Sequence, residues 1–161
     1  MNEIEFQKVI KDIKENQISK LELESRNLSL GQVDELTRNL EENTSIRYIN
    51  LSDNLIGDEG AKVLAIYLEK NPTLTSIRLN GNQIGDEGAK ALAASLEKNS
   101  TITSINLWGN SIGAEGAKAL AVSLEKNSTI TSINLSHNQT GVEGAKAIAG
   151  SLEKKQHHHF D

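Results

Sequence analysis

Apolar residues in this chain alternate with polar residues over short stretches and then recur at the spacing of one helix face. In the stretch that begins at Leu74, Ile77 and Leu79 alternate with polar residues, which predicts a short strand with one apolar side. The segment that follows places apolar residues on one side of a helix, namely Ala89, Leu92, Ala93 and Leu96. The pattern therefore predicts a strand followed by a helix.

This pattern is one of five copies. Three nearly identical segments begin at Leu74, Ile102 and Ile130, which are 28 residues apart, and two further steps of 28 residues toward the amino terminus reach Ile46 and Ile18. Five units in one register therefore cover residues 18–154. A single strand and helix cannot bury their apolar faces alone, so the units must stack.

Stacking decides the shape that we expect. Neighbouring parallel strands lie about 4.8 Å apart, whereas packed helices need roughly 8 to 10 Å. A stack with strands on one side and helices on the other must therefore curve toward the strands. The expected fold is an α/β solenoid, a short horseshoe with a parallel sheet on its concave face and helices on its convex face.

The apolar frame of each unit reads LxxLxLxxNxI. This frame resembles that of leucine-rich repeat proteins, and the unit length resembles the 28-residue subtype found in ribonuclease inhibitor. The nearly identical units are also similar to short effector proteins of bacteria that live inside host cells. The resemblance implies a non-enzymatic module that binds a protein partner in its concave curve and that can inhibit or regulate this partner. It also implies a place in the cytoplasm, or in the host cytosol for a secreted effector.

The two ends of the chain differ from the repeats. Residues 1–17 carry apolar residues at helical spacing, and we expect them to form a helix that caps the first unit; they are Phe6, Val9, Ile10 and Ile13. Residues 155–161 form a short tail with no obvious cap. An apolar edge that stays partly open predicts weak end-to-end self-association, or a longer natural chain.

Polar residues and glycines recur at the turn between strand and helix. We expect the recurring asparagines to satisfy buried turn backbone groups and not to bind a ligand; they are Asn54, Asn82, Asn110 and Asn138. The first unit has Arg26 instead, which indicates a modified terminal repeat. The recurring glycines also match turn requirements, since no phosphate-binding glycine pattern is present; they are Gly57, Gly85, Gly113 and Gly141.

Composition and charge argue against several classes of function for this chain. The net charge is −5, from 17 Lys and Arg against 22 Asp and Glu, which disfavours nucleic acid as a partner. The chain has no Cys, so disulfides, thiolate metal sites and cysteine nucleophiles are excluded. No apolar stretch is long enough for a membrane span, and the first residues do not read as a signal peptide.

Catalytic residues do not gather in any recognisable set. His137 is the one histidine inside the repeats, and the acidic residues recur at helix starts and ends, as solvated caps do. The tract His157 to His159 resembles an unstructured tail or a tag remnant more than a metal site. We therefore expect no enzyme, no cofactor and no metal.

The outward strand positions form four columns across the concave face, and most are small and polar. The columns are Lys20, Tyr48, Ser76, Ser104 and Ser132; Glu22, Asn50, Arg78, Asn106 and Asn134; Glu24, Ser52, Asn80, Trp108 and Ser136; and Ser25, Asp53, Gly81, Gly109 and His137. The departures are Tyr48, Arg78, Trp108, His137 and a few charges, Asp53 among them. Tyr, Trp and Arg dominate binding hot spots, so these five residues form the expected partner-binding patch.

Two other functions stay open at this point. One is the regulation or activation of an enzyme such as a small GTPase, although no loop insertion carries an obvious Arg for that role. The other is a purely structural, self-associating solenoid. The identity of the partner is not encoded in these patterns.

Overall fold

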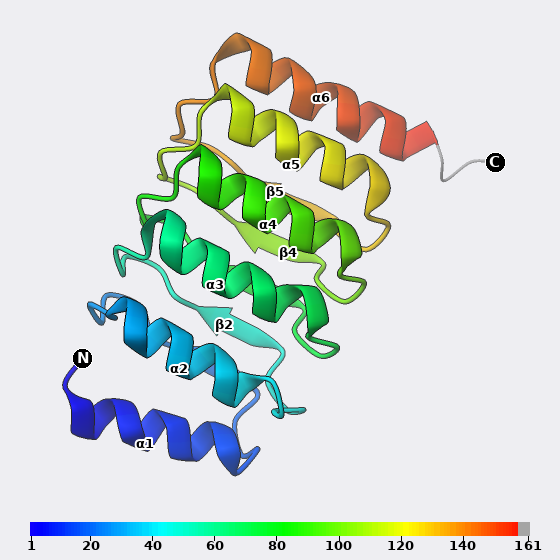
Figure 1. Cartoon of the computed structure of the whole chain (residues 1–161). Coiled ribbons are helices and arrows are strands. Elements are labelled where there is room, and N and C mark those ends of the chain that lie inside the picture. The colour runs from blue at the N-terminus through cyan, green and yellow to red at the C-terminus, as the bar shows by residue number, and fades with distance from the viewer. Residues whose placement is uncertain (158–161) are drawn as a thin grey trace.

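In a computed structural model, which describes residues 1–157, six helices alternate with five strands. The elements are α1 (Glu3–Lys14), β1 (Lys20–Glu22), α2 (Leu30–Leu40), β2 (Tyr48–Asn50), α3 (Gly57–Lys70), β3 (Ser76–Arg78), α4 (Asp86–Lys98), β4 (Ser104–Asn106), α5 (Ala114–Lys126), β5 (Ser132–Asn134) and α6 (Gly141–His157). They stack in chain order, with the helices in one layer and the strands in another (Figure 1).

The strands form one parallel sheet in the order β1-β2-β3-β4-β5. Each strand pairs with the next at an offset of one repeat, so that Ile49 lies opposite Ile77 and Ile77 lies opposite Ile105. This register confirms the expected α/β solenoid, and the sheet remains open at both edges among the residues described. The helices cover one face of the sheet (Figure 1). The stack is expected to curve toward the other face, because strands are spaced more closely than helices, and we call that face the concave face.

The core lies between the sheet and the helix layer. Its members are the inward strand residues and the inner stripe of each helix, and the fully enclosed ones include Leu51, Leu64, Leu68, Leu74, Ile77, Leu79, Leu92, Leu96, Ile102 and Leu107. Because equivalent positions in successive repeats carry the same residue type, one continuous core runs through the stack.

Helix α1 packs beside α2 at the amino-terminal end of the stack. The side chain of Asn2 accepts a hydrogen bond from the Glu5 amide at 2.9 Å and caps the helix. Phe6 and Ile13 have no exposed surface. The Asn43 side-chain amide donates to the Ile13 carbonyl at 2.7 Å, which joins the end of α1 to the end of α2. The helix expected in residues 1–17 is therefore present and buries its apolar stripe.

The recurring turn asparagines connect neighbouring repeats. Oδ1 of Asn82 accepts hydrogen bonds from the backbone amides of Asn54 and Ile56, at 3.0 and 3.2 Å, in the preceding repeat. Its Nδ2 donates to the Leu51 carbonyl at 2.9 Å. Asn110 bonds the preceding turn in the same way. The structural interpretation of these asparagines is confirmed.

Two aspartates at helix starts act differently from the expectation of solvated caps. Oδ1 of Asp58 accepts from the amides of Gly85 and Gly88, at 2.7 and 2.9 Å, and so caps α4 of the next repeat. Asp86 caps α5 by the same pair of contacts, at 2.8 Å each. These carboxylates are therefore connectors between repeats, and the expectation was wrong for them because a helix start lies against the next repeat and not against water.

The backbone φ angle of the glycine at each helix start depends on whether an aspartate makes this contact. Gly85 and Gly113, whose amides meet an aspartate, have φ of −99° and −89°. Gly57 and Gly141 have φ of 62° and 61°, in the left-handed region. In the repeat before each of them, Leu30 or Ala114 stands at the position that Asp58 and Asp86 occupy in the other repeats. The left-handed backbone explains why glycine is needed at these two positions.

The carboxyl-terminal end of the stack leaves apolar residues uncovered. Val142 and Leu152 on α6 are 69% and 42% exposed, and Ile133 and Leu135 are half-buried, whereas Ile105 and Leu107 of the preceding repeat are enclosed. Helix α6 reaches His157, so the first three residues of the segment 155–161 continue the helix.

The Lys155 ammonium donates to the Ile130 carbonyl, and burial lowers the pKa of its side chain. In the preceding repeat, the Thr129 hydroxyl donates to the equivalent carbonyl, that of Ile102, at 2.9 Å. In the last described repeat, Lys155 therefore supplies the donor for the Ile130 carbonyl, the role that the Thr129 hydroxyl has for the Ile102 carbonyl.

Candidate functional site

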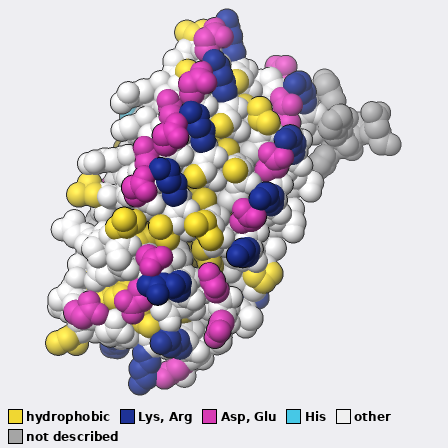
Figure 2. Space-filling model, in the orientation of Figure 1, with side chains coloured by type: hydrophobic (Ala, Val, Ile, Leu, Met, Phe, Trp, Pro, Cys, Tyr) yellow, Lys and Arg dark blue, Asp and Glu magenta, His cyan; other side chains and the backbone are white. Residues whose placement is uncertain are grey.

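Many charges on the convex face are paired with one another. Within each of four helices a Lys meets a Glu three residues earlier, and three further pairs join neighbouring helices; the pairs are Lys62–Glu59, Lys90–Glu87, Lys118–Glu115, Lys146–Glu143, Lys98–Glu69, Lys126–Glu97 and Lys154–Glu125. Figure 2 shows them as two rows of alternating positive and negative side chains across the helix layer. The regular pairing indicates a solvated outer surface.

The charges on the concave face are different. None of them takes part in an ion pair within 4.0 Å in the part of the chain that the structure describes; they are Lys20, Glu22, Glu24, Asp53 and Arg78. Charges that the fold does not pair are available to a partner. The concave face is therefore the candidate interface.

Trp108 and His137 form an aromatic contact at the β4 and β5 end of this face. Their ring centroids are 4.7 Å apart and the planes are tilted by 45°. Trp108 is 41% exposed, as expected for a side chain that points into the inner curve. Its backbone amide donates to Oδ1 of Asn106 at 3.0 Å, which fixes the turn that presents the indole. Two of the five expected residues thus lie in direct contact.

Tyr48 lies in a group of charges at the opposite end of the sheet. The Lys20 ammonium is 6.0 Å from the centre of its ring. Burial raises the pKa of the Tyr48 hydroxyl, the positive charge of Arg78 opposes this, and the carboxylates of Glu22 and Glu24 add to it. Tyr48 and Arg78, on adjacent strands, therefore influence each other.

Asn50 donates hydrogen bonds to Glu22 on β1 and to Glu24 in the turn after it. Its Nδ2 donates to Oε2 of Glu22 and to Oε2 of Glu24, at 3.0 Å each. Asn50 and Ser52 are only 3% and 1% exposed, although both belong to the outward columns. The expectation of solvent exposure was wrong at these two positions, because Asn50 lies against Glu22 and Glu24 of the preceding repeat and the Ser52 hydroxyl donates to Asn50 and to Asn80 of the next repeat.

Asp53 is exposed and has a left-handed backbone, with φ of 55°. Its carboxylate lies against Gly81 in the next repeat, where the Oδ1 atom occupies the space that a Cβ would need. No hydrogen bond, ion pair or ring contact in the described part of the chain joins Asp53 to Trp108 or Arg78. The structure therefore presents the five expected residues on one face, as an aromatic pair and a charged group.

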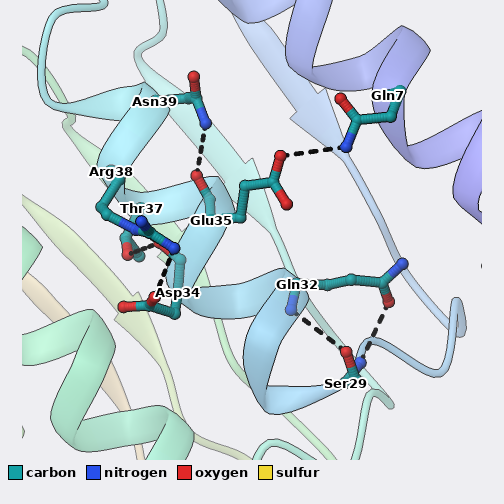
Figure 3. A network of polar contacts seen from close by, with 8 residues as sticks. All are labelled: Gln7, Ser29, Gln32, Asp34, Glu35, Thr37, Arg38 and Asn39. Atoms are coloured by element: carbon teal, nitrogen blue, oxygen red, sulfur yellow. Dashed lines mark hydrogen bonds and ion pairs between the residues drawn. The ribbon is translucent and has the colours of Figure 1, made fainter.

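Two cavities flank α2, away from the sheet. One, of about 460 Å³, is lined by Ile13, Lys14, Asn16, Arg38, Asn39, Glu42 and Asn43. The other, of about 210 Å³, is lined by Glu41, Tyr67, Lys70 and Asn71. Polar contacts hold α2 itself: the Gln7 amide donates to Glu35 at 3.0 Å, and Ser29 with Gln32 caps the helix (Figure 3).

Tyr67 lines the second cavity. It stands where later repeats have Ser95, Ser123 and Ser151, and it is 3% exposed. Nδ2 of the buried Asn71 has no hydrogen-bond partner, whereas Nδ2 of the equivalent Asn99 donates to the Leu68 carbonyl at 2.7 Å. The repeat with the larger Tyr67 side chain is therefore the one in which the asparagine, Asn71, does not donate to a carbonyl of the preceding repeat.

Among the residues that the structure describes, no three His, Asp or Glu side chains are grouped so that they could hold a metal ion. The described helices include none that is long and apolar enough to cross a membrane. The side chains of the tract His157 to His159 lie outside the described residues.

The solved structures that resemble this one include the following two domains. Actin-binding site 2 of leiomodin-1 aligns with a TM-score of 0.81 at 20% identity, over 96% of this chain and 91% of that one. The tropomodulin C-terminal domain from Caenorhabditis elegans aligns with a TM-score of 0.79 at 16% identity, over 95% and 94% of the two chains. At these identities the likeness shows a common fold. A search of curated protein sequences found no match.

The sequence itself matches the family described as Leucine Rich repeat in four segments, 42–65, 70–93, 98–121 and 126–149. Each segment contains the strand and the turn asparagine of one of the last four units, and the strand and turn of the first unit, with its Arg26 in place of the asparagine, lie outside them. More than half of the chain is matched, and the parallel sheet with helices on its other face agrees with that match. The chain therefore belongs to the leucine-rich repeat family.

Proposed function

We propose that this chain is a non-enzymatic module that binds a protein partner through its concave face. The observation that carries the proposal is the half-exposed indole of Trp108, which rests on His137 in a surface of mostly small polar side chains. A large aromatic group with a polar edge is the type of residue that supplies most of the binding energy in protein interfaces. The unpaired concave charges support the same choice of face.

The structural relatives support a protein as the partner. The leiomodin-1 domain is named as an actin-binding site, and it shares the fold of this chain. Actin is therefore a defined first probe, and the partner itself remains to be identified. Inhibition or regulation of that partner, including the role of a bacterial effector, is a further part of the proposal that only the captured partner can test.

The experiment is a comparison of three immobilised proteins in one lysate. The wild type, Trp108→Ala and the convex-face control Lys118→Ala are incubated with the lysate, and the retained proteins are identified by mass spectrometry. We expect at least one protein to be retained by the wild type and by the control but not by Trp108→Ala. Equal retention of every protein by all three would contradict the proposal.

A self-associating solenoid is a second candidate, and the uncovered apolar surface of α6 and β5 favours it. Residues that are enclosed in the other repeats are accessible there. We expect a mass that rises with concentration in light scattering, and a Leu152→Lys variant that stays monomeric. A wild-type mass of one chain at all concentrations would remove this candidate.

A further inference from the structure

We infer, resting on the proposed function, that the partner contacts the concave face with two different side chains. A basic side chain meets Glu22 and Glu24 at one end of the sheet, and an aromatic or large apolar side chain covers Trp108 at the other end. The inference comes from the distribution of charge, burial and hydrogen bonds over the five strands.

The acidic end is held in place before a partner arrives. Glu22 and Glu24 are both exposed, and each accepts a hydrogen bond from the same Nδ2 atom, that of Asn50, at 3.0 Å. Asn50 is itself fixed, because its Oδ1 accepts from the backbone amide of Ser52 at 3.1 Å and from its hydroxyl at 2.5 Å. Two side chains that are already ordered lose less conformational entropy on binding.

The exposed carboxylates of Glu22 and Glu24 can accept a cation from a partner. Neither glutamate forms an ion pair with a described residue. Two neighbouring carboxylates match the donors of a guanidinium or an ammonium group, and charge-assisted hydrogen bonds are stronger than neutral ones. Asp53 adds a third negative charge to the same half of the face. Lys20 and Arg78 supply two positive charges on the same face, so the outward columns carry a net charge of −1 and the attraction for a basic side chain is local to the two glutamates.

The aromatic end carries no carboxylate and no Lys or Arg in its outward columns. These columns in β4, β5 and the turns after them contain Ser104, Asn106, Trp108, Gly109, Ser132, Asn134, Ser136 and His137. The indole contacts the His137 ring at a tilt of 45°, and 41% of the Trp108 surface stays exposed. Such a platform selects a flat aromatic or apolar group.

The two ends are separated by three strand spacings, from β1 to β4. With about 4.8 Å between strands, this is roughly 14 Å, which an extended peptide spans in about four residues. Arg78, on β3, lies between the two ends and is exposed. The partner segment therefore crosses the strands and places its basic and aromatic residues about four positions apart when it is extended.

A display library of random twelve-residue peptides tests the inference without knowledge of the partner. It is selected separately on the wild type, on Trp108→Ala, on Glu22→Gln/Glu24→Gln and on the convex control Glu59→Gln/Glu87→Gln. The Gln variants keep an acceptor for Asn50 and remove only charge. We expect the wild type and the control to enrich peptides that combine a Lys or Arg with an aromatic residue.

Affinities of one enriched peptide separate the outcomes. Loss of about tenfold or more on Glu22→Gln/Glu24→Gln, with no loss on the convex control, supports the inference. Binding that depends on Trp108 but not on the two glutamates overturns the inference and leaves the proposed function standing. Binding that is independent of Trp108 and of the glutamates overturns both.

Discussion

At the scale of single residues, hydrogen bonds of asparagine side chains link one repeat to the next. A side-chain amide can accept and donate at once, so Asn82 satisfies two backbone amides and a carbonyl of the preceding repeat. Asn106 lies on the concave side and is half-buried, and its main contact is with the backbone amide of Trp108. Two residues of the same type thus have different roles.

Replacing these residues separates the two roles. Asn82→Leu leaves buried turn groups unpaired, each at a cost of about 1 to 3 kcal/mol, whereas water can replace the amide of Asn106. We expect Asn82→Leu to lower the free energy of unfolding several times more than Asn106→Leu, as measured by urea denaturation. Equal losses would mean that the assigned facing of the strands is wrong.

Tyr67 gives a prediction that depends on pH. Burial raises the pKa of its hydroxyl above the ordinary value of 10.0, so the folded chain keeps the proton at a pH where the unfolded chain releases it. The stabilisation is therefore complete below pH 10 and is lost as the pH rises above it. We expect Tyr67→Phe to lose less stability than the wild type between pH 9 and about pH 11.5.

The control for this prediction is Tyr48→Phe, because Tyr48 is less deeply buried and the charge of Arg78 opposes its shift. Urea unfolding of the three proteins at each pH gives the comparison. Tyr48→Phe should follow the wild type closely. A wild type and a Tyr67→Phe protein that lose stability in parallel would show that Tyr67 does not titrate differently in the folded state.

At the scale of secondary-structure elements, a residue in one repeat determines the start of the next helix. Asp86 caps α5 through the amides of Gly113 and Gly116. Glu87, its neighbour in the chain, pairs only with the exposed Lys90. The close approach of the carboxylate also leaves no space for a Cβ at Gly116, where it would lie 2.7 Å from Oδ1.

We expect Asp86→Ala to destabilise the fold by about 1 kcal/mol, the usual cost of a lost helix cap. Glu87→Ala is the matched control in the same helical turn and should have a smaller effect, because its partner is solvated. Chemical denaturation with both variants measures the difference. If the two substitutions cost the same, the cap on α5 contributes nothing beyond surface charge.

Sequence patterns predicted the repeat, the register and the turn asparagines, because each follows from periodicity within one unit. They did not predict that Asp58 bonds across to α4, or that Glu22 and Glu24 meet at Asn50. These contacts join residues about one repeat apart, and the pattern of one repeat does not say which neighbouring side chains reach each other. Comparing each column with the column of the preceding unit could have indicated both.

At the scale of the whole molecule, the two faces of the solenoid differ in the ion pairing of their charged side chains. The convex face pairs many of its Lys and Glu side chains, in rows that run across the stacked helices (Figure 2). On the concave face, the described charges have no ion pair, and the aromatic contact of Trp108 with His137 stands apart from them. This asymmetry is the physical basis for assigning recognition to the concave face.

The affinity of the captured partner for Trp108→Ala is the most direct test of that assignment. We expect a loss of at least about thirtyfold, equivalent to roughly 2 kcal/mol, for truncation of a central aromatic anchor. The melting temperature should stay nearly unchanged, because the indole is 41% exposed. Lys118→Ala, on the convex face, should bind like the wild type. Undiminished affinity of Trp108→Ala, or a complex with the partner on the helices, would contradict the concave-face assignment.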